Sequence, residues 1–427
     1  MGREGTSAGG GLLSSGLILI LIVAAAYLAA HALSEWLARR FLVVSGAEYL
    51  ILGILLGPYV TSFIRTSPVE SFAPFLTLAL GWTGAQIGTW FYLPKLVRTR
   101  GIIFNVAFFE AIIALVFIAG VMGFAFAMLF NYTLEQTLRP AIALGAIAVA
   151  SSPRGVEVLA NRLSRRGAIV RQIETTASID ALVAITAFSL MLCFRHVVPL
   201  GISRAPTATE WAVISIGIGF VGGALFHLFL GRERQVDRLF IGMAGAIILA
   251  SGTAAYLRLS PLLPTMIIGA ILVNTSRNRD VITTLLSGVS RPLYFVLLLF
   301  AGAAWQPATR TAWLLPVVLF IFVRVAGKVG SARLAARLNR RYRALGPNWG
   351  VALLGQGSVA VAIAVNYLML DVSLLPNVVF TAAIVSVLLT DFMGGYLTRF
   401  VVEDHLRRLT SRLGDVISRT ISFEGKP

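Results

Sequence analysis

The chain is a long series of apolar runs separated by short polar or basic segments. Many of these runs reach the roughly 18 to 20 residues that a helix needs to cross ~30 Å of hydrocarbon. Breaking them at Arg/Lys, Pro and Gly clusters predicts thirteen helices, at 12–35, 43–61, 71–93, 102–130, 138–160, 174–195, 210–230, 238–257, 261–275, 288–305, 311–333, 348–370 and 374–400. The pattern predicts an all-α polytopic membrane protein, with one membrane domain over 1–427, transmembrane helices within 12–400 and a short basic tail at 401–427.

Two of the predicted helices carry helix-breaking residues in mid-span. These residues are Ser151, Ser152, Pro153 and Gly155 in the helix at 138–160, and Gly355, Gln356, Gly357 and Ser358 in the helix at 348–370. Unwound backbone at membrane depth survives only where protein or a watery cavity satisfies its polar groups. Each broken helix is followed by one more helix, so the breaks take matching places in two halves, which indicates a transporter binding site. Kinked helices packed through small residues are the alternative.

Composition supports the membrane class and excludes a nucleic-acid-binding protein. Hydrophobic residues make up 57% of the chain and charged residues 13%, whereas a soluble domain has about 45–50% and 25%. The formal net charge is +17, but Arg and Lys gather in short loops between apolar runs, mainly after the odd-numbered helices. The positive-inside rule then places the N-terminus outside and the C-terminus in the cytoplasm.

Little in the sequence points to an enzyme or to a bound cofactor. The single cysteine, Cys193, excludes an intramolecular disulfide, and the four histidines show no metal-ligand spacing. A G-x-G-x-x-G match at Gly217, Gly219 and Gly222 lies inside a predicted helix with no strand before it, so a dinucleotide site fails its structural context. We expect a non-enzyme without a cofactor.

Ionisable residues inside the predicted spans are the main candidates for chemistry. Each costs about 2.5–3.5 kcal/mol on insertion scales and usually faces a cavity or a partner. Asp180 lies in the otherwise almost wholly apolar run "ETTASIDALVAITAFSLML". The other such residues are Arg154 and Glu157 after the first break, Arg324 and Lys328 at 311–333, Glu110 at 102–130 and Asp391 at 374–400.

Arg324 and Lys328 are four residues apart and share one helix face. We expect Asp180 to be their anionic partner, with the cations setting the affinity of this carboxylate for protons. A carboxylate so placed can bind a proton or a small cation, one at a time, which is sufficient for exchange. A purely structural ion pair or snorkelling is the alternative for the two cations, and ordinary contacts between helices are the alternative for Glu110 and Asp391.

Several motifs, in order, resemble a known family. They are "GAEYLILGILLGP" (46–58), "SSP" (151–153), Asp180 one helix later, "LPTMIIGAILVN" (263–274), "RPLYFVLLLFAGAAW" (291–305), "RVAGKVGSARLAARL" (324–338) and "LLGQGSVAVAIA" (353–364). Together they resemble the monovalent cation:proton antiporter superfamily, with its sodium/hydrogen exchanger-like membrane domain, over about 17–400.

The resemblance implies a fold, a function and a set of site residues. The fold is an inverted repeat, with a core domain of two crossed discontinuous helices beside a dimerisation domain, and hence a homodimer. The function is exchange of Na⁺ or K⁺ for H⁺ by an elevator-like movement in the lipid bilayer, here of a bacterial inner membrane. Asp180 corresponds to the transient ligand of the transported cation, Lys328 to the membrane-embedded lysine, and Ser151 and Ser152 to polar contacts at the first break. Gln356 and Ser358 would supply such contacts at the second.

The site also departs from the family's pattern. The family usually has Asp-Asp or Asn-Asp where this chain has Ile179-Asp180, so the usual partner of the lysine is missing, and another alignment leaves Ala181 in the binding position. Arg154 adds a cation after the first break. Two other functions therefore stay open. One is a non-transporting scaffold or sensor on the same fold, and the other is a carrier of an anionic solute.

Overall fold

The computed structural model describes most of the predicted helical region. The described residues are 46–62, 72–98, 101–153, 168–194, 206–233, 235–306, 313–339, 348–370 and 375–390, together with 342–343, 346 and single residues between 393 and 404. The predicted helix at 12–35, the residues Arg154, Gly155, Glu157 and Asp391, and most of the tail at 401–427 lie outside the described residues.

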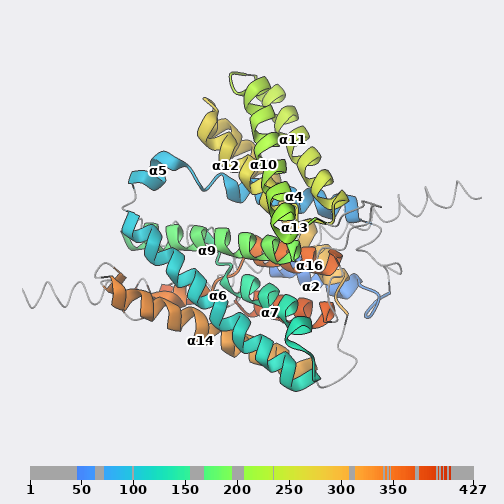
Figure 1. The fold of residues 1–427 in the computed structure, drawn as a ribbon, viewed down its shortest axis with the longest axis vertical. Helices are drawn as coiled ribbons and strands as arrows, with labels where there is room; N and C mark the ends of the chain where they lie inside the picture. The colour runs from blue at the N-terminus through green and yellow to red at the C-terminus, as the bar shows by residue number, and fades with distance from the viewer. Residues whose placement is uncertain are drawn as a thin grey trace, which may run out of the picture.

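All regular elements in this part of the chain are helical (Figure 1). The α-helices are α2 (Ala47–Leu56), α4 (Ala73–Gly88), α5 (Leu93–Arg98), α6 (Gly101–Phe130), α7 (Leu134–Val149), α9 (Ala168–Cys193), α10 (Ala208–Leu230), α11 (Val236–Tyr256), α12 (Leu262–Thr275), α13 (Arg279–Ala303), α14 (Leu314–Leu338) and α16 (Ser358–Leu370). A 3₁₀ helix, η2 (Trp349–Leu354), precedes α16, and a further apolar helix covers Pro376–Thr390.

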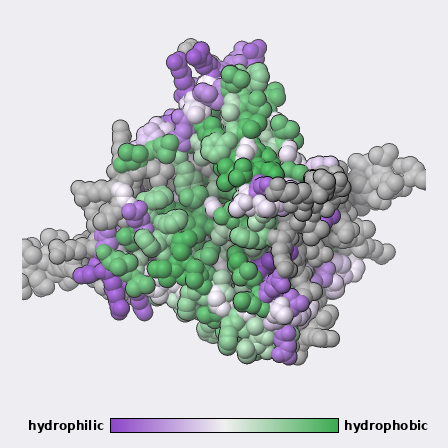
Figure 2. All heavy atoms as spheres, viewed as in Figure 1, coloured by the Kyte–Doolittle hydropathy of each residue, from purple (hydrophilic) through white to green (hydrophobic). Residues whose placement is uncertain are grey.

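Several of these helices are suited to a lipid environment. Within the described residues, six helices are long and apolar enough to cross a membrane, over Ile103–Phe130, Val170–Cys193, Ala208–Leu230, Val236–Tyr256, Arg279–Ala303 and Leu314–Leu338. Large apolar side chains are exposed on their outer faces, for example Phe124 on α6 and Phe220 and Phe229 on α10. Figure 2 shows a largely apolar surface, with hydrophilic residues gathered towards its edges. Such a surface is what hydrocarbon, rather than water, would cover.

The helices pack in two groups. The core group contains α6, α7, α9, α14, η2 and α16, and the scaffold group contains α2, α4, α10, α11, α12 and α13. In Figure 1 α6, α7 and α14 lie in the lower part of the view and α10, α11 and α12 in the upper part, with α9 between them. The most extensive helix contacts are made within each group, while α9 and α16 of the core group make smaller contacts with the scaffold.

Glycines bring backbones of the scaffold group into direct contact. A Cβ atom added at Gly88 of α4 would collide with the carbonyl oxygen of Met266 on α12, and one at Gly269 would collide with that of Ala85. Small residues at such crossings let helices approach closely in a membrane. The scaffold group is therefore held by close contacts that leave little room for its helices to slide past one another.

The two predicted interruptions are confirmed, and they meet. Helix α7 ends at Val149 and its chain is unwound at Ala150–Ser152, while η2 ends at Leu354 and Gly355–Gly357 separate it from α16. The backbone N–H of Ser152 donates to the carbonyl of Gly355 at 2.9 Å. A Cβ atom at Gly357 would lie 2.7 Å from the Ser152 hydroxyl oxygen. Any side chain at position 357 would therefore force Ser152 to shift where the second break passes the first.

Helix α13 differs from the prediction in its start. The sequence predicts a helix at 288–305 after a loop that contains Arg279, whereas α13 runs from Arg279 to Ala303 with Pro292 inside it. Ile282, Leu286 and Ser290 are buried at a spacing of four residues, so packing on one face maintains the helix through a region that reads as polar. The total of thirteen helices stays a prediction, since 12–35 lies outside the described residues.

Candidate ion-binding site

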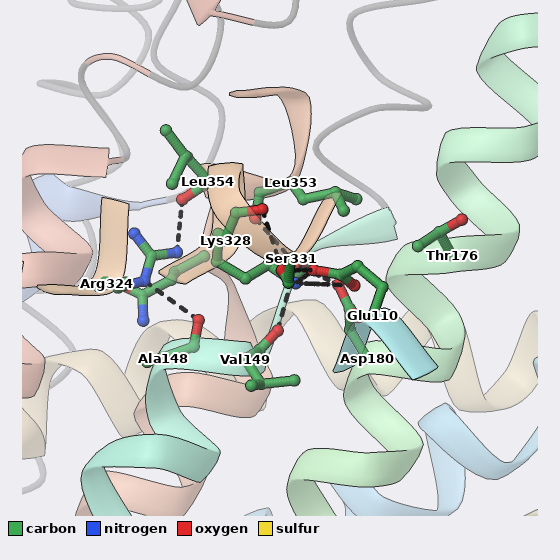
Figure 3. A network of polar contacts seen from close by, with 12 residues as sticks. Glu110, Ala148, Val149, Thr176, Asp180, Arg324, Lys328, Ser331, Leu353 and Leu354 are labelled. Carbon is green, nitrogen blue, oxygen red and sulfur yellow. Dashed lines mark hydrogen bonds and ion pairs between the residues drawn. The ribbon is translucent and has the colours of Figure 1, made fainter. Parts of the chain in front are cut away.

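Asp180 lies near the middle of α9, with apolar residues on both sides. Its side chain is 0% exposed, and Ile179 and Ala181 beside it are also fully buried. One carboxylate oxygen, Oδ2, accepts a hydrogen bond from Ser151 Oγ at 2.6 Å and forms an ion pair with Lys328 Nζ at 2.7 Å (Figure 3). The carboxylate is therefore placed against the first helix break and against a cation from α14.

A second carboxylate reaches the same lysine. Glu110, on α6, lies with Oε1 3.2 Å and Oε2 3.4 Å from Lys328 Nζ. Ser331, three residues after the lysine on α14, donates its hydroxyl to Glu110 Oε1 at 2.7 Å. Glu110, Asp180 and Lys328 are all 0% exposed. We call these three residues the buried ionic cluster.

Ser151 joins both helix breaks to the buried ionic cluster. Its Oγ lies 2.6 Å from Asp180 Oδ2, 2.8 Å from the carbonyl of Leu353 in η2 and 3.2 Å from the carbonyl of Val149 in α7. A hydroxyl donates one hydrogen at a time, so these three acceptors compete for it. The other oxygen of Asp180, Oδ1, is buried and has no hydrogen-bond partner among the described residues.

Arg324 has a different role from the expected one. Its guanidinium, with the side chain 1% exposed, donates from Nε to the carbonyl of Ala148 at 3.2 Å and from Nη2 to the carbonyl of Leu354 at 2.7 Å. These carbonyls end α7 and η2, where unpaired C=O groups carry partial negative charge. The sequence predicts both cations opposite Asp180, whereas Lys328 meets the carboxylates and Arg324 joins the two interrupted helix ends.

We expect Arg324→Met to destabilise the protein by about 3 kcal/mol or more, because two charge-assisted hydrogen bonds are lost and two carbonyls are left unpaired. The measurement is thermal or denaturant unfolding in detergent. Arg337→Met is the matched control, since Arg337 is exposed on the same helix. Equal stability of the two variants would contradict this role.

The remaining predicted residues belong to the crossing of the breaks. Gln356 Nε2 donates to the carbonyl of Ile147 in α7 at 2.8 Å, and its Oε1 accepts from Ser386 at 2.8 Å. Pro153 is buried directly after the first break, and Ser358 begins α16. Gln356 therefore binds the two broken helices to each other and does not contact Asp180 in the bonds it makes here.

A cluster of polar and aromatic side chains lies around Thr176, one turn before Asp180 on α9. Tyr342, which follows α14, is fully buried and donates its hydroxyl to the carbonyl of Ile103 at 3.0 Å, with Thr176 Oγ1 at 3.3 Å. Its ring lies 5.0 Å from that of Trp349. Burial raises the pKa of Tyr342 to about 12, so it stays a neutral donor. Tyr342 and Trp349 thus form part of a packed cluster beside Thr176, one helix turn before Asp180.

Glu110 is the site residue that the sequence interpretation underrated. It carries the same signal as Asp180, a single carboxylate in a long apolar run, but nothing in the spacing along one chain tells that α6 lies beside α14. Arg154 and Glu157, which the sequence places near the first break, lie outside the described residues.

Comparison with known proteins places this arrangement in a family. A model of the sodium/hydrogen exchanger transmembrane domain matches residues 86–404. The chain belongs to the sodium/hydrogen exchanger family. This confirms the predicted superfamily, and it identifies the exchanger as an integral membrane protein of a transporter class. A search of curated proteins found no match.

Solved structures agree on the fold of this exchanger. The sodium proton antiporter MjNhaP1 from Methanocaldococcus jannaschii at pH 8 matches with a TM-score of 0.66 and 15% identity, covering 90% of this chain and 98% of the other. An electron-microscopy structure of the same antiporter matches with a TM-score of 0.66 and 14% identity, covering 90% and 97%. The predicted all-helical antiporter fold is therefore confirmed.

Proposed function

We propose that this protein is a secondary transporter that exchanges a monovalent cation, Na⁺ or K⁺, for H⁺. The observation that carries the proposal is the contact of 2.7 Å between Lys328 Nζ and Asp180 Oδ2 beside the two helix breaks. A carboxylate that already holds one positive charge in a dry core can hold another in its place. Protons and metal ions are the charges that an exchanger of this family would bring to it.

Competition for Asp180 couples the two ions. A carboxylate buried without a partner is costly, so Asp180 should be occupied in turn by a proton, by a cation or by the Lys328 ammonium. Release of one ion makes the carboxylate available to the other. Lys328 provides a partner in the interval, which lowers the cost of an ion-free site in the low-dielectric interior.

We propose that alternating access is an elevator-like movement of the core group against the scaffold group. Asp180, Ser151, Lys328 and Arg324 all belong to the core group or to its breaks, so they would travel together. The scaffold group is held by close glycine contacts, and among the described helices of the core α9 and α16 make the larger contacts with it. Rigid-body movement along such a boundary is an established type of transition.

The proposal includes the placement of the protein. The alternation of basic loops supports an N-terminus outside and a cytoplasmic C-terminus, with the tail at 401–427 at the inner face of a bacterial inner membrane. The exposed apolar faces of α10 and α11 in the scaffold group suit lipid or a second copy in a homodimer. The whole chain would then act as one membrane domain.

A vesicle assay tests the function directly. Purified protein is reconstituted with an acidic interior and a pH-sensitive dye, and NaCl, KCl or choline chloride is added outside. We expect dequenching with Na⁺ or K⁺, and we expect none with choline or in protein-free vesicles. Folded protein that responds to no monovalent cation would contradict exchange and favour the scaffold.

The same assay separates an anion carrier. In the described residues, Lys328 is bonded to two carboxylates and Arg324 to two carbonyls, which leaves these cations engaged and does not favour an anion site. Replacement of chloride by gluconate should leave the Na⁺ or K⁺ response unchanged. A response that follows the anion would favour the carrier instead.

A further inference from the structure

The buried ionic cluster contains one carboxylate more than the exchange mechanism above uses. Glu110 is fully buried at a contact between three core helices, α6, α9 and α14, where neither helix capping nor surface charge requires it. We propose that Glu110 is a second ligand of the transported cation, and that this cation takes the position of the Lys328 ammonium between Glu110 and Asp180. The inference rests on the proposed function and adds the place and the ligands of the cation.

The Lys328 ammonium marks where a cation is stable in this interior. Its Nζ lies 2.7 Å from Asp180 Oδ2, 3.2 Å from Glu110 Oε1 and 3.4 Å from Glu110 Oε2. Oxygens of two carboxylates therefore converge on one point from two different helices (Figure 3). A free monovalent cation at that point would meet the same oxygens without the constraint of a lysine side chain.

The oxygens around this point fit a hard cation. Ser151 Oγ and Ser331 Oγ each contact one of the two carboxylates, at 2.6 and 2.7 Å, and the carbonyl of Leu353 lies 2.8 Å from Ser151 Oγ. Carboxylate, carbonyl and hydroxyl oxygens are the ligands that hard cations prefer. In addition, Asp180 Oδ1 is buried without a partner among the described residues, so this carboxylate has an unused ligand atom.

The charge count explains why a second carboxylate matters. A single ionised carboxylate is neutralised by one ammonium, whereas two ionised carboxylates leave one negative charge uncompensated beside Lys328. Attraction between unit charges rises steeply as the effective dielectric constant falls. Two carboxylates would therefore hold a dehydrated monovalent cation in competition with a tethered ammonium, which one carboxylate would do poorly.

The helices that supply these ligands also agree with the proposed movement. Glu110, Asp180 and Lys328 come from α6, α9 and α14, and all three helices belong to the core group. A cation held between Glu110 and Asp180 would need no ligand from the scaffold group. It would therefore move with the core without losing its coordination.

Glu110→Gln tests the inference in the vesicle assay, with the rate measured against Na⁺ or K⁺ concentration. We expect the KM for the cation to rise about tenfold or more, because a charge-assisted contact is lost, while the maximal rate changes little. The control is Glu48→Gln, since Glu48 is a buried glutamate on α2 of the scaffold group. An unchanged KM in Glu110→Gln would overturn the inference.

The two proposals fail in different ways. If the wild-type protein transports no cation, the proposed function is contradicted. If the wild-type protein transports cations and the KM of Glu110→Gln is unaltered, only the role of Glu110 is contradicted. If Glu110→Gln does not fold, Glu110→Asp decides, because its shorter carboxylate should raise the KM and change the preference between Na⁺ and K⁺. A Glu110→Asp protein with wild-type KM and preference would overturn the inference.

Discussion

Asp180→Asn is expected to reduce cation-driven proton movement in vesicles to the level of protein-free vesicles. The amide is isosteric with the carboxylate, but it carries no charge to neutralise a cation and does not take up a proton in the physiological range. The substitution therefore removes both cation binding and proton binding at position 180. The dye assay with Na⁺, K⁺ and choline, run beside wild-type protein, measures this.

The amide oxygen introduced by this substitution would still accept a hydrogen bond from Lys328, and Glu110 would remain 3.2 Å from that ammonium. We therefore expect the variant to fold, with a loss of stability below the roughly 3–5 kcal/mol that follows when a buried charge loses its only partner. Asp237→Asn is the matched control, because Asp237 is exposed in the first turn of α11. Exchange that persists in folded Asp180→Asn protein would remove this carboxylate from the mechanism.

The helix breaks could be predicted from sequence because their cause is local. Pro153 lacks a backbone donor, and Gly355 and Gly357 are poor helix formers because glycine loses the most backbone freedom on folding. The charged residues in apolar runs could be found for a similar reason, since insertion costs are paid residue by residue. Both the helix breaks and the candidate charged residues could therefore be predicted from local sequence alone.

The partners of those residues could not be predicted, because they depend on how distant helices cross. The spacing of Arg324 and Lys328 places them on one face, but it does not tell that the first reaches carbonyls of Ala148 and Leu354 and the second reaches carboxylates. Glu110 and Lys328 are 218 residues apart in the chain. The choice between an ordinary contact and an ionic site at Glu110 needed the position of α6 beside α14.

The predicted start of α13 was wrong for a related reason. The residues at 276–287 read as a loop before the predicted helix, yet Ile282 and Leu286 are buried within α13. The Ser290 hydroxyl lies 2.9 Å from Gln86 Oε1 of α4 and 2.5 Å from the carbonyl of Leu286 in its own helix. Tertiary packing on Leu286 and Ser290 maintains the helix where hydropathy alone ends it. Helical segments whose polar residues bond to a neighbouring helix are thus the ones most easily misassigned as loops.

Lys328→Met is expected to make the stability of the protein depend on monovalent cations. Removal of the ammonium leaves Asp180 and Glu110 facing each other in a site that is 0% exposed, and breaking a buried pair in this way costs about 3–5 kcal/mol. We expect a lower unfolding temperature than wild type in choline chloride. Arg337→Met, which removes an exposed charge from the same helix, should show no such change.

Na⁺ or K⁺ should restore the stability of Lys328→Met, because a ligand that binds the folded state stabilises it by mass action, by about 2.7 kcal/mol at one hundred times its Kd. The wild-type protein should respond less, since its own ammonium occupies the position between the two carboxylates. Addition of Glu110→Gln to Lys328→Met should weaken the response to cations, because one carboxylate then remains. A Lys328→Met protein whose unfolding temperature is the same in choline, Na⁺ and K⁺ would show that the ammonium does not stand where a transported cation binds.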